Sequence, residues 1–195
     1  TLYSLQELEE LSAVCRERDL KLFVDGARLA YALASPANDV TLADLARLTD
    51  VFYIGGTKCG SLFGEAVVIP ERGSIRQFVT QMKQHGALLA KGRLLGVQFE
   101  ALFEDGLYLT IGEPAVKATA RIREALKRAG YVVTMDSPTN LTFVALDQAG
   151  HERLSDKVRY SIWETLPDGR YLARIGTSWA TPEEDVAAFE QALAR

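Results

Sequence analysis

The stretch Leu20-Lys21-Leu22-Phe23-Val24-Asp25-Gly26-Ala27-Arg28 decides the fold. Its first five residues predict a short apolar strand that ends at Asp25, and Gly26 then turns the chain into a short helix. Helices and apolar strands keep alternating along the next 40 residues or so, which is typical of an α/β fold with a mainly parallel sheet. The ranges expected are helix 28–33, helix 42–48, strand 51–54, a glycine loop over 55–64 and strand 66–69.

Outward from this stretch, the pattern predicts two domains. Residues 1–112 would form part of a large domain, opened by a capping box at Ser4-Leu5-Gln6-Glu7 and a helix to about residue 18. Residues 113–195 would form a small α+β domain. The remaining expected elements are helices 71–84, 94–109, 113–128 and 154–163, strands 141–146 and 171–175, and a last capping box at 181–184.

The sheet of the large domain looks incomplete. Three strands are few for such apolar sequences, because a parallel sheet needs neighbours on its edges and cover on both faces. The chain also begins at Thr1 without an initiator Met. We therefore expect a piece of a longer polypeptide, with further strands upstream of Thr1.

Composition narrows the class of protein. The chain of 195 residues has a formal charge of −4, and its basic residues are scattered among acidic ones, which disfavours a nucleic-acid partner. No run approaches the ~20 apolar residues of a membrane helix, so no membrane partner is expected. The only two cysteines, Cys15 and Cys59, form no metal-type spacing, and they fit a reduced, cytoplasmic setting. No metal site is expected.

Two polar residues follow the two apolar strands. Asp25 comes directly after the first strand, and Lys58 comes four residues after Ile54. The carboxyl ends of parallel strands share one crevice, where a lysine and a carboxylate could hold pyridoxal 5′-phosphate (PLP) through its aldehyde and its pyridine nitrogen. On spacing alone, a surface lysine in a glycine loop with a strand-end aspartate is an equally good interpretation. A phosphate-binding P-loop is excluded, since Thr57 precedes Lys58 where that motif needs glycine.

A resemblance adds to this interpretation. Phe23-Val24-Asp25-Gly26-Ala27-Arg28-Leu29, with Lys58 in Gly55-Gly56-Thr57-Lys58-Cys59-Gly60, resembles the low-specificity threonine aldolases. More broadly it resembles the β-eliminating lyases among the aminotransferase-type (fold type I) PLP enzymes. The resemblance runs from Thr1 onward and implies an aspartate-aminotransferase-like PLP fold whose upstream half of the large domain is absent.

The resemblance also implies roles for five residues. Lys58 corresponds to the Schiff-base lysine and Asp25 to the partner of the pyridine nitrogen. Arg28 corresponds to an arginine beside the cofactor hydroxyl and the substrate, and Thr57 is a candidate for the cofactor phosphate. Arg174, in the last predicted strand, corresponds to the arginine that binds the substrate α-carboxylate, a task that suits a guanidinium fork.

Other residues receive weaker or structural assignments. The segment Lys91–Gly96 lies where relatives carry a basic, glycine-containing segment, and the resemblance implies that it approaches the cofactor phosphate across a dimer interface. A stacking histidine and the main phosphate loop are expected upstream of Thr1. The remaining candidates are expected to be structural: His85 and His151 at helix ends, Cys59 in packing, and Trp163, Trp179 and Phe189 in the core of the small domain.

The resemblance implies a PLP-dependent lyase that cleaves threonine-type β-hydroxy-α-amino acids to glycine and an aldehyde, the catalytic base being unidentified. It also implies a homo-oligomer, a dimer or tetramer with the active site near the interface. Two alternatives stay open. The same scaffold supports β-elimination or transamination, since fold does not fix reaction, and the chain could be a non-catalytic fragment or relative.

Overall fold

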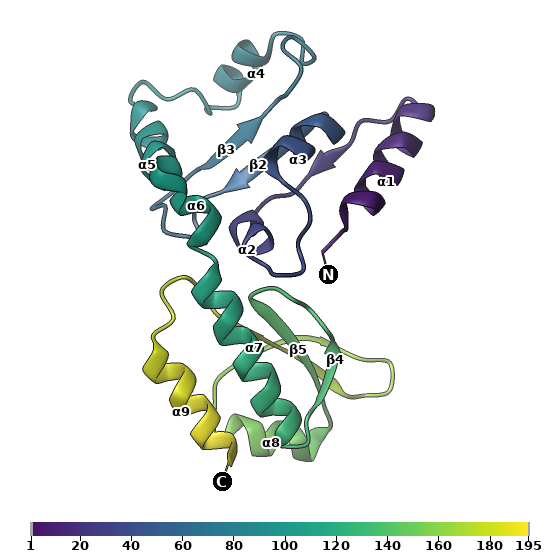
Figure 1. The fold of residues 1–195 in the computed structure, drawn as a ribbon, viewed down its shortest axis with the longest axis vertical. Coiled ribbons are helices and arrows are strands. Elements are labelled where there is room, and N and C mark those ends of the chain that lie inside the picture. Colours follow the sequence, from purple (N-terminus) through teal and green to yellow (C-terminus); the bar gives the residue numbers. More distant parts are fainter. Residues whose placement is uncertain (1, 195) are drawn as a thin grey trace. The chain divides into compact units, whose positions relative to one another are not determined.

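The computed structural model describes residues 2–194 (Figure 1). These residues form two compact units. The N-terminal unit consists of Tyr3–Leu33 and Asn38–Thr110. The C-terminal unit consists of residues 111–194 with short segments at Leu2 and Ala34–Ala37. Among the described residues, no helix has both the length and the apolar character needed to cross a membrane.

The N-terminal unit is a small α/β structure around a three-stranded sheet in the order β1-β2-β3. Its first helix, α1, has the expected capping box at Ser4 and Glu7 and packs on α3, where the Ser12 hydroxyl donates to the Leu48 carbonyl at 2.7 Å. The elements are α1 (Leu5–Glu17), β1 (Phe23–Val24), α2 (Leu29–Leu33), α3 (Leu42–Leu48), β2 (Val51–Gly55), β3 (Glu65–Val68), α4 (Phe78–Gln84), α5 (Arg93–Phe103), the 3₁₀ turn η1 (Glu104–Gly106) and α6 (Leu107–Thr110).

The sheet is mixed. β1 pairs with β2 in parallel, with Val24 beside Phe52, whereas β3 returns antiparallel to β2. The expectation of a mainly parallel sheet therefore holds for the first pair only. Residues 56–64 alone connect β2 to β3, and a parallel return needs a crossover of about a dozen residues or more.

Three expected elements of this unit are shorter or broken. The strand expected over 20–24 covers only Phe23–Val24. The helix expected over 71–84 begins at Phe78, because Gly73 and Gln77 have positive φ values of 87° and 52°. The helix expected over 94–109 is interrupted at Asp105, whose φ of 50° is incompatible with a continuous helix.

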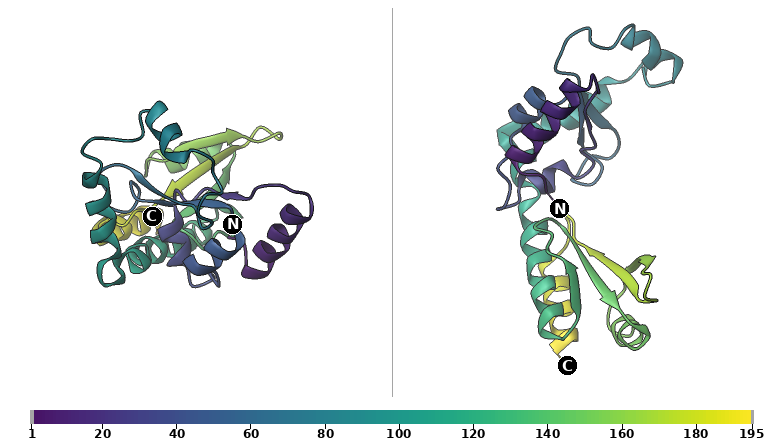
Figure 2. Two further views of the ribbon diagram at one scale, coloured as in Figure 1. Left: turned by 90° about the horizontal axis from the view of Figure 1, so that it is seen from above. Right: turned by 90° about the vertical axis from the view of Figure 1, so that its right-hand side faces the viewer.

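The C-terminal unit is a four-stranded antiparallel sheet, in the order β4-β5-β7-β6, with helices on one face. α9 lies alongside α7 (Figure 1), the two helices run in the same direction in the right-hand view of Figure 2, and Arg121 of α7 donates to the Glu190 carboxylate of α9 at 2.6 Å. The elements are α7 (Glu113–Arg128), β4 (Val132–Met135), β5 (Leu141–Leu146), α8 (Gln148–Ser155), β6 (Ser161–Thr165), β7 (Tyr171–Gly176) and α9 (Glu183–Ala194).

The core of this unit lies between the sheet and the helices. It is formed by alternate residues of β5 and β7, such as Val144 and Ala173, together with Ile122 and Leu126 of α7 and Val186 of α9. Phe189 packs against it as expected. The placement of Trp163 and Trp179 in this core was wrong, because their side chains are 56% and 45% exposed.

The helix expected over 154–163 was also wrong. α8 begins earlier, where the Asp147 carboxylate caps it by accepting from the Gly150 amide at 2.6 Å, and it ends at Ser155. Residues 161–165 form the edge strand β6 instead. Their Ile, Trp and Thr side chains favour strands, and pairing with β7 decides between the two structures. β4 was not expected at all.

Candidate functional site

Asp25 lies at the carboxyl end of β1, where the backbones of β1 and β2 come into contact. The Gly55 amide donates to the Gly26 carbonyl at 3.0 Å. A Cβ on Gly26 would stand 1.7 Å from the Tyr53 carbonyl oxygen, and one on Gly55 would stand 2.7 Å from the carbonyl oxygens of Gly26 and Ala27. Both glycines are therefore required for the segment after Asp25 to lie against the start of the Lys58 loop.

The Asp25 carboxylate is held in its ionised form. The Tyr53 hydroxyl, from the neighbouring strand, and the Ala27 amide, at 3.0 Å, both donate to Oδ1. These bonds lower the pKa of Asp25, the Tyr53 bond most, and the charges of Lys58 and Arg28 add to the effect. The same bond raises the pKa of Tyr53 to about 12. Among the described residues, Oδ2 has no hydrogen-bond partner and remains able to accept one.

Lys58 lies in a tight turn whose backbone is fixed by two buried tyrosines. The Tyr31 hydroxyl donates to the Lys58 carbonyl, and the Tyr108 hydroxyl donates to the Gly55 carbonyl at 2.9 Å. Within the turn, the Cys59 amide donates to the Gly56 carbonyl at 3.0 Å. The Lys58 side chain is exposed, and its amine forms no hydrogen bond or ion pair with any described residue. The turn therefore presents a lysine amine that has no partner among the described residues, on a backbone held by hydrogen bonds.

Glu65 anchors the other side of this turn. Its carboxylate accepts from the Gly56 amide at 2.8 Å and from the Thr57 hydroxyl at 3.0 Å. Thr57, a sequence candidate for the cofactor phosphate, thus donates to an anion already. A second anion beside it would meet like-charge repulsion.

α5 supports the loop that carries Lys58. The Gln98 side-chain oxygen accepts from the Leu62 amide at 2.7 Å and from the Ser61 hydroxyl at 3.0 Å. A Cβ on Gly64 would stand 2.2 Å from a methyl carbon of Leu95, so the start of α5 lies against the loop. The segment Lys91–Gly96, predicted to lie near the cofactor, is therefore adjacent to the Lys58 loop.

Arg28 and Cys59 lie beside the pair. Arg28 immediately precedes α2, and its guanidinium is near enough to lower the pKa of Asp25. Cys59 is 2% exposed, and its thiol lies 3.3 Å from the Gly55 carbonyl oxygen. Burial raises the pKa of this thiol to about 11, which leaves it protonated and unreactive at neutral pH.

Arg174 belongs to the C-terminal unit. It lies in the middle of β7, paired with Phe143 of β5 on one side and Ser161 of β6 on the other. Its guanidinium carbon lies 4.5 Å from the centre of the Trp163 ring. No carboxylate among the described residues pairs with it.

The two histidines lie apart from these residues in the sequence and contact local partners. His85 caps the C-terminus of α4. His151, in α8, contacts the Tyr160 hydroxyl through Nδ1 at 2.7 Å. The described residues contain no group of three or more His, Cys, Asp or Glu side chains that could hold a metal ion.

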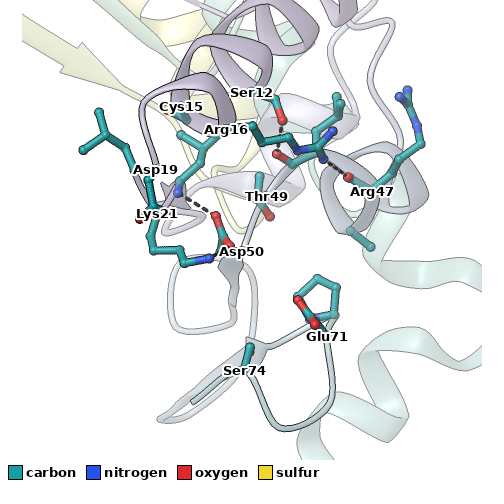
Figure 3. A pocket seen from close by; sticks show the side chains of 15 residues that line it. Ser12, Cys15, Arg16, Asp19, Lys21, Arg47, Thr49, Asp50, Glu71 and Ser74 are labelled. Carbon is teal, nitrogen blue, oxygen red and sulfur yellow. Dashed lines mark hydrogen bonds and ion pairs between the residues drawn. The ribbon is translucent and has the colours of Figure 1, made fainter. Parts of the chain in front are cut away.

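A cavity of about 320 Å³ lies at the opposite ends of the strands (Figure 3). It is lined by the residues that precede β1 and β2, and by Pro70 and Glu71 after β3. Its polar groups largely bond to one another: Arg16 donates to the Arg47 carbonyl at 2.8 Å, and Lys21 pairs with Asp50 at 3.1 Å. The cavity is therefore separate from the Asp25–Lys58 site.

Sequence reasoning missed the supporting residues of the site. Tyr53 was visible only as part of an apolar strand, and its role depends on the register that sets it beside Asp25. The other supporting contacts join residues far apart in the sequence. Tyr31 is 27 residues from Lys58, Tyr108 is 53 residues from Gly55, and Gln98 is more than 30 residues from Leu62. One sequence signal could have indicated the Tyr53–Asp25 hydrogen bond: Tyr53 lies in the predicted strand 51–54, which neighbours the strand that ends at Asp25.

Comparison with known proteins identifies the family. The family model described as beta-eliminating lyase matches residues 1–149. The chain belongs to the beta-eliminating lyase family. The resemblance drawn from the Asp25 and Lys58 motifs is thereby confirmed.

Among curated members, the chain is similar to two proteins named low-specificity L-threonine aldolase. It is 37% identical over 191 residues to the one from Pseudomonas sp. and 30% identical over 191 residues to the one from Pseudomonas aeruginosa. These alignments cover 95% of this chain and 53% of each relative. The chain thus spans about half the length of the curated relatives it matches.

Solved structures confirm the expected fold. A structure of Leishmania major threonine aldolase matches all of this chain and 57% of its own, with a TM-score of 0.93 and 45% identity. An aspartate aminotransferase from Thermus thermophilus matches all of this chain and 53% of its own, with a TM-score of 0.69. At 17% identity, this second match shows the fold alone. The beta-eliminating lyase chain therefore has part of the aspartate-aminotransferase-like fold.

Proposed function

We propose that this protein is a PLP-dependent lyase that cleaves threonine-type β-hydroxy-α-amino acids to glycine and an aldehyde. The observation that carries the proposal is the site at the touching ends of β1 and β2. There, an ionised carboxylate with one free oxygen, on Asp25, accompanies a free amine on a fixed turn, on Lys58. The similarity to two low-specificity L-threonine aldolases supports this choice of reaction.

The residues of this site fit PLP. Lys58 would hold the cofactor through its aldehyde, and Asp25 would face the pyridine nitrogen. Arg28 would lie beside the cofactor hydroxyl and the substrate. We do not extend the proposal to Thr57 as a phosphate ligand, because its hydroxyl already donates to the Glu65 carboxylate.

When bound, PLP supplies an aldehyde for the substrate amine and an electron-withdrawing ring that stabilises negative charge at the substrate α-carbon. The chain's own residues set the conditions for that chemistry. Asp25 would keep a proton on the pyridine nitrogen, which requires the carboxylate to stay ionised, and its lowered pKa supports this role. Arg174 would bind the substrate α-carboxylate through the planar fork of its guanidinium.

Assembly and location form part of the same proposal. We propose a homo-oligomer, a dimer or tetramer with its active site near the interface, in the cytoplasm. Apolar side chains exposed on the Lys58 loop and on α5 and α6 support association, since large exposed apolar patches mark interaction surfaces. They are Leu62, Phe63, Leu94, Val97, Leu107 and Leu109.

A second candidate function is another PLP reaction on the same scaffold, either β-elimination or transamination. The family name, beta-eliminating lyase, favours elimination as this alternative. The site residues are common to these reactions, so the products must decide. A non-catalytic relative is the third possibility, and it predicts no turnover of any amino acid.

The test uses the full-length product of the gene that encodes this chain, supplied with PLP. We expect L-threonine to give glycine and acetaldehyde, and Lys58→Ala to lose this activity by several orders of magnitude because the amine that holds the cofactor is gone. Lys83→Ala, at an exposed lysine in the last turn of α4, is the matched control and should retain activity. Pyruvate and ammonia from serine or cysteine, without threonine cleavage, would identify an eliminase instead.

A further inference from the structure

The exposed face of the C-terminal sheet carries a cluster of three side chains, Phe143, Trp163 and Arg174. Neighbours along a strand alternate between faces, and Val144 and Ala173 belong to the core on the helix side. Phe143 and Arg174 therefore point to the face away from α7 and α9. They are directly paired in the register of β5 and β7.

A β-bulge brings Trp163 into this cluster. In the pairing of β6 with β7, Ile162 lies opposite Ala173 and Glu164 lies opposite Leu172, so Trp163 is the extra residue of the bulge. Bulges commonly re-aim a side chain beside a functional site. The Trp163 ring meets Phe143 edge-on, with centroids 6.3 Å apart and planes at 78°, and this contact fixes its orientation.

The Arg174 guanidinium carbon lies 4.5 Å from the centre of the Trp163 ring, within cation–π range. Trp163 is 56% exposed, so burial in the core does not explain a large aromatic side chain at this position. Arg121, Arg123 and Arg170, in the same unit, each pair with a carboxylate. Arg174 has no such partner among the described residues, although it is half-buried.

We propose that Trp163 is a positioning residue that holds the Arg174 guanidinium ready for the substrate carboxylate. Stacking uses the face of the guanidinium, whereas a carboxylate binds to the N–H groups along its edge, so both contacts can form together. A fixed guanidinium loses less conformational entropy on binding. The inference rests on the proposed function, because it takes the α-carboxylate of an amino acid as the ligand of Arg174.

The test compares Trp163→Leu with Trp163→Phe in the full-length product with PLP. We expect Trp163→Leu to raise the KM for L-threonine about fivefold, with kcat little changed, because a cation–π contact is lost. Trp163→Phe keeps an aromatic face and should stay within about twofold of wild type. Val132→Ala, at an exposed residue of the same sheet, is the matched control for non-specific loosening.

Two further measurements separate positioning from mere stability. In an Arg174→Ala background, Trp163→Leu should add nothing to the KM, because the group it positions is absent. Calorimetry with glycine should show weaker binding by the same factor as the KM, whether or not threonine is cleaved. Absent glycine binding by wild type, an unchanged KM in Trp163→Leu, or an equal rise in KM on the Arg174→Ala background would overturn the proposal. Missing threonine cleavage with these glycine effects intact would refute only the proposed lyase.

Discussion

The pKa of Asp25 is lowered mainly by a side chain on another strand, Tyr53. An aspartate at a strand end is commonplace, but here the Tyr53 hydroxyl donates to Oδ1 and leaves Oδ2 open. The sequence offered Asp25 and Lys58 as candidates, because each follows a recognisable strand end, and the family resemblance favoured them over a purely structural interpretation. It could not select Tyr53, because the hydrogen bond depends on which residue of β2 lies beside the end of β1.

Replacing Tyr53 by Phe should raise the pKa of Asp25 toward its ordinary value of 3.8, because the largest cause of its lowering is removed. The Ala27 amide and the charges of Lys58 and Arg28 should keep part of the shift. NMR titration of the Asp25 carboxyl carbon in the cofactor-free protein measures this change. Tyr3→Phe, at an exposed tyrosine, is the control, and superimposable Asp25 titrations in all three proteins would refute the interpretation.

The sign of the effect on stability follows from the lowered pKa. A carboxyl group with a lower pKa in the folded state stabilises the protein above its unfolded-state pKa, here about 3.8, and this stabilisation is lost as the pH falls through the folded value. As the pH falls below 4, the Tyr53→Phe variant should therefore lose less free energy of unfolding than the wild type. The difference should be small, because Asp25 is exposed and solvent screens its interactions.

Among the elements, the contact between β1 and β2 decides whether the site forms. Gly26 and Gly55 let the strand ends approach to hydrogen-bond distance, and no other residue fits at Gly26 without moving the Tyr53 carbonyl. The candidate site and the fold of the N-terminal unit therefore depend on the same pair of glycines. The sequence could not show that the nearest neighbour of these glycines would be the other strand, because that contact depends on the pairing of β1 with β2.

Gly26→Ala should destabilise the protein by about 3 kcal/mol or more, because the new methyl group meets backbone that cannot move freely. Gly96→Ala is the matched control. Gly96 lies within α5 with nothing within 4 Å of the added Cβ, so the same substitution should stabilise the helix by about 0.5–1 kcal/mol. Urea unfolding of the two variants measures both effects. Changes of the same sign would contradict the close approach of β1 and β2.

Sequence patterns predicted elements well where local signals are complete. α3 and α7 have the expected bounds, 42–48 and 113–128. α3 has a capping box at Thr41 and Asp44, and α7 has Pro114 in its first turn and Gly130, with a φ of 82°, just after its end. The sequence patterns did not predict β4 or β6, the two edge strands of the C-terminal sheet. β4 pairs with the next strand, β5, and β6 pairs with the next strand, β7, so each edge strand is defined by its pairing and by the turn that follows it rather than by a strong signal of its own.

At the level of the whole molecule, the chain contains two units and about half the length of its curated relatives. Within the N-terminal unit, the lysine and carboxylate of the proposed cofactor site are already arranged. Within the C-terminal unit, a proposed carboxylate-binding arginine is held on an aromatic ring. The proposed reaction follows from the motifs only through family resemblance, because the products of PLP chemistry depend on more than these residues.

The central claim is that Lys58 holds PLP, and borohydride trapping in the full-length product tests it most directly. Reduction in the presence of PLP should fix the cofactor on the Lys58 amine. Trypsin then cuts after Arg47 and Arg72 but not after the modified lysine, so mass spectrometry should find the label on the peptide of residues 48–72. Lys58→Ala should abolish this label. A label on a different lysine, or none on this peptide in the wild-type protein, would contradict the account.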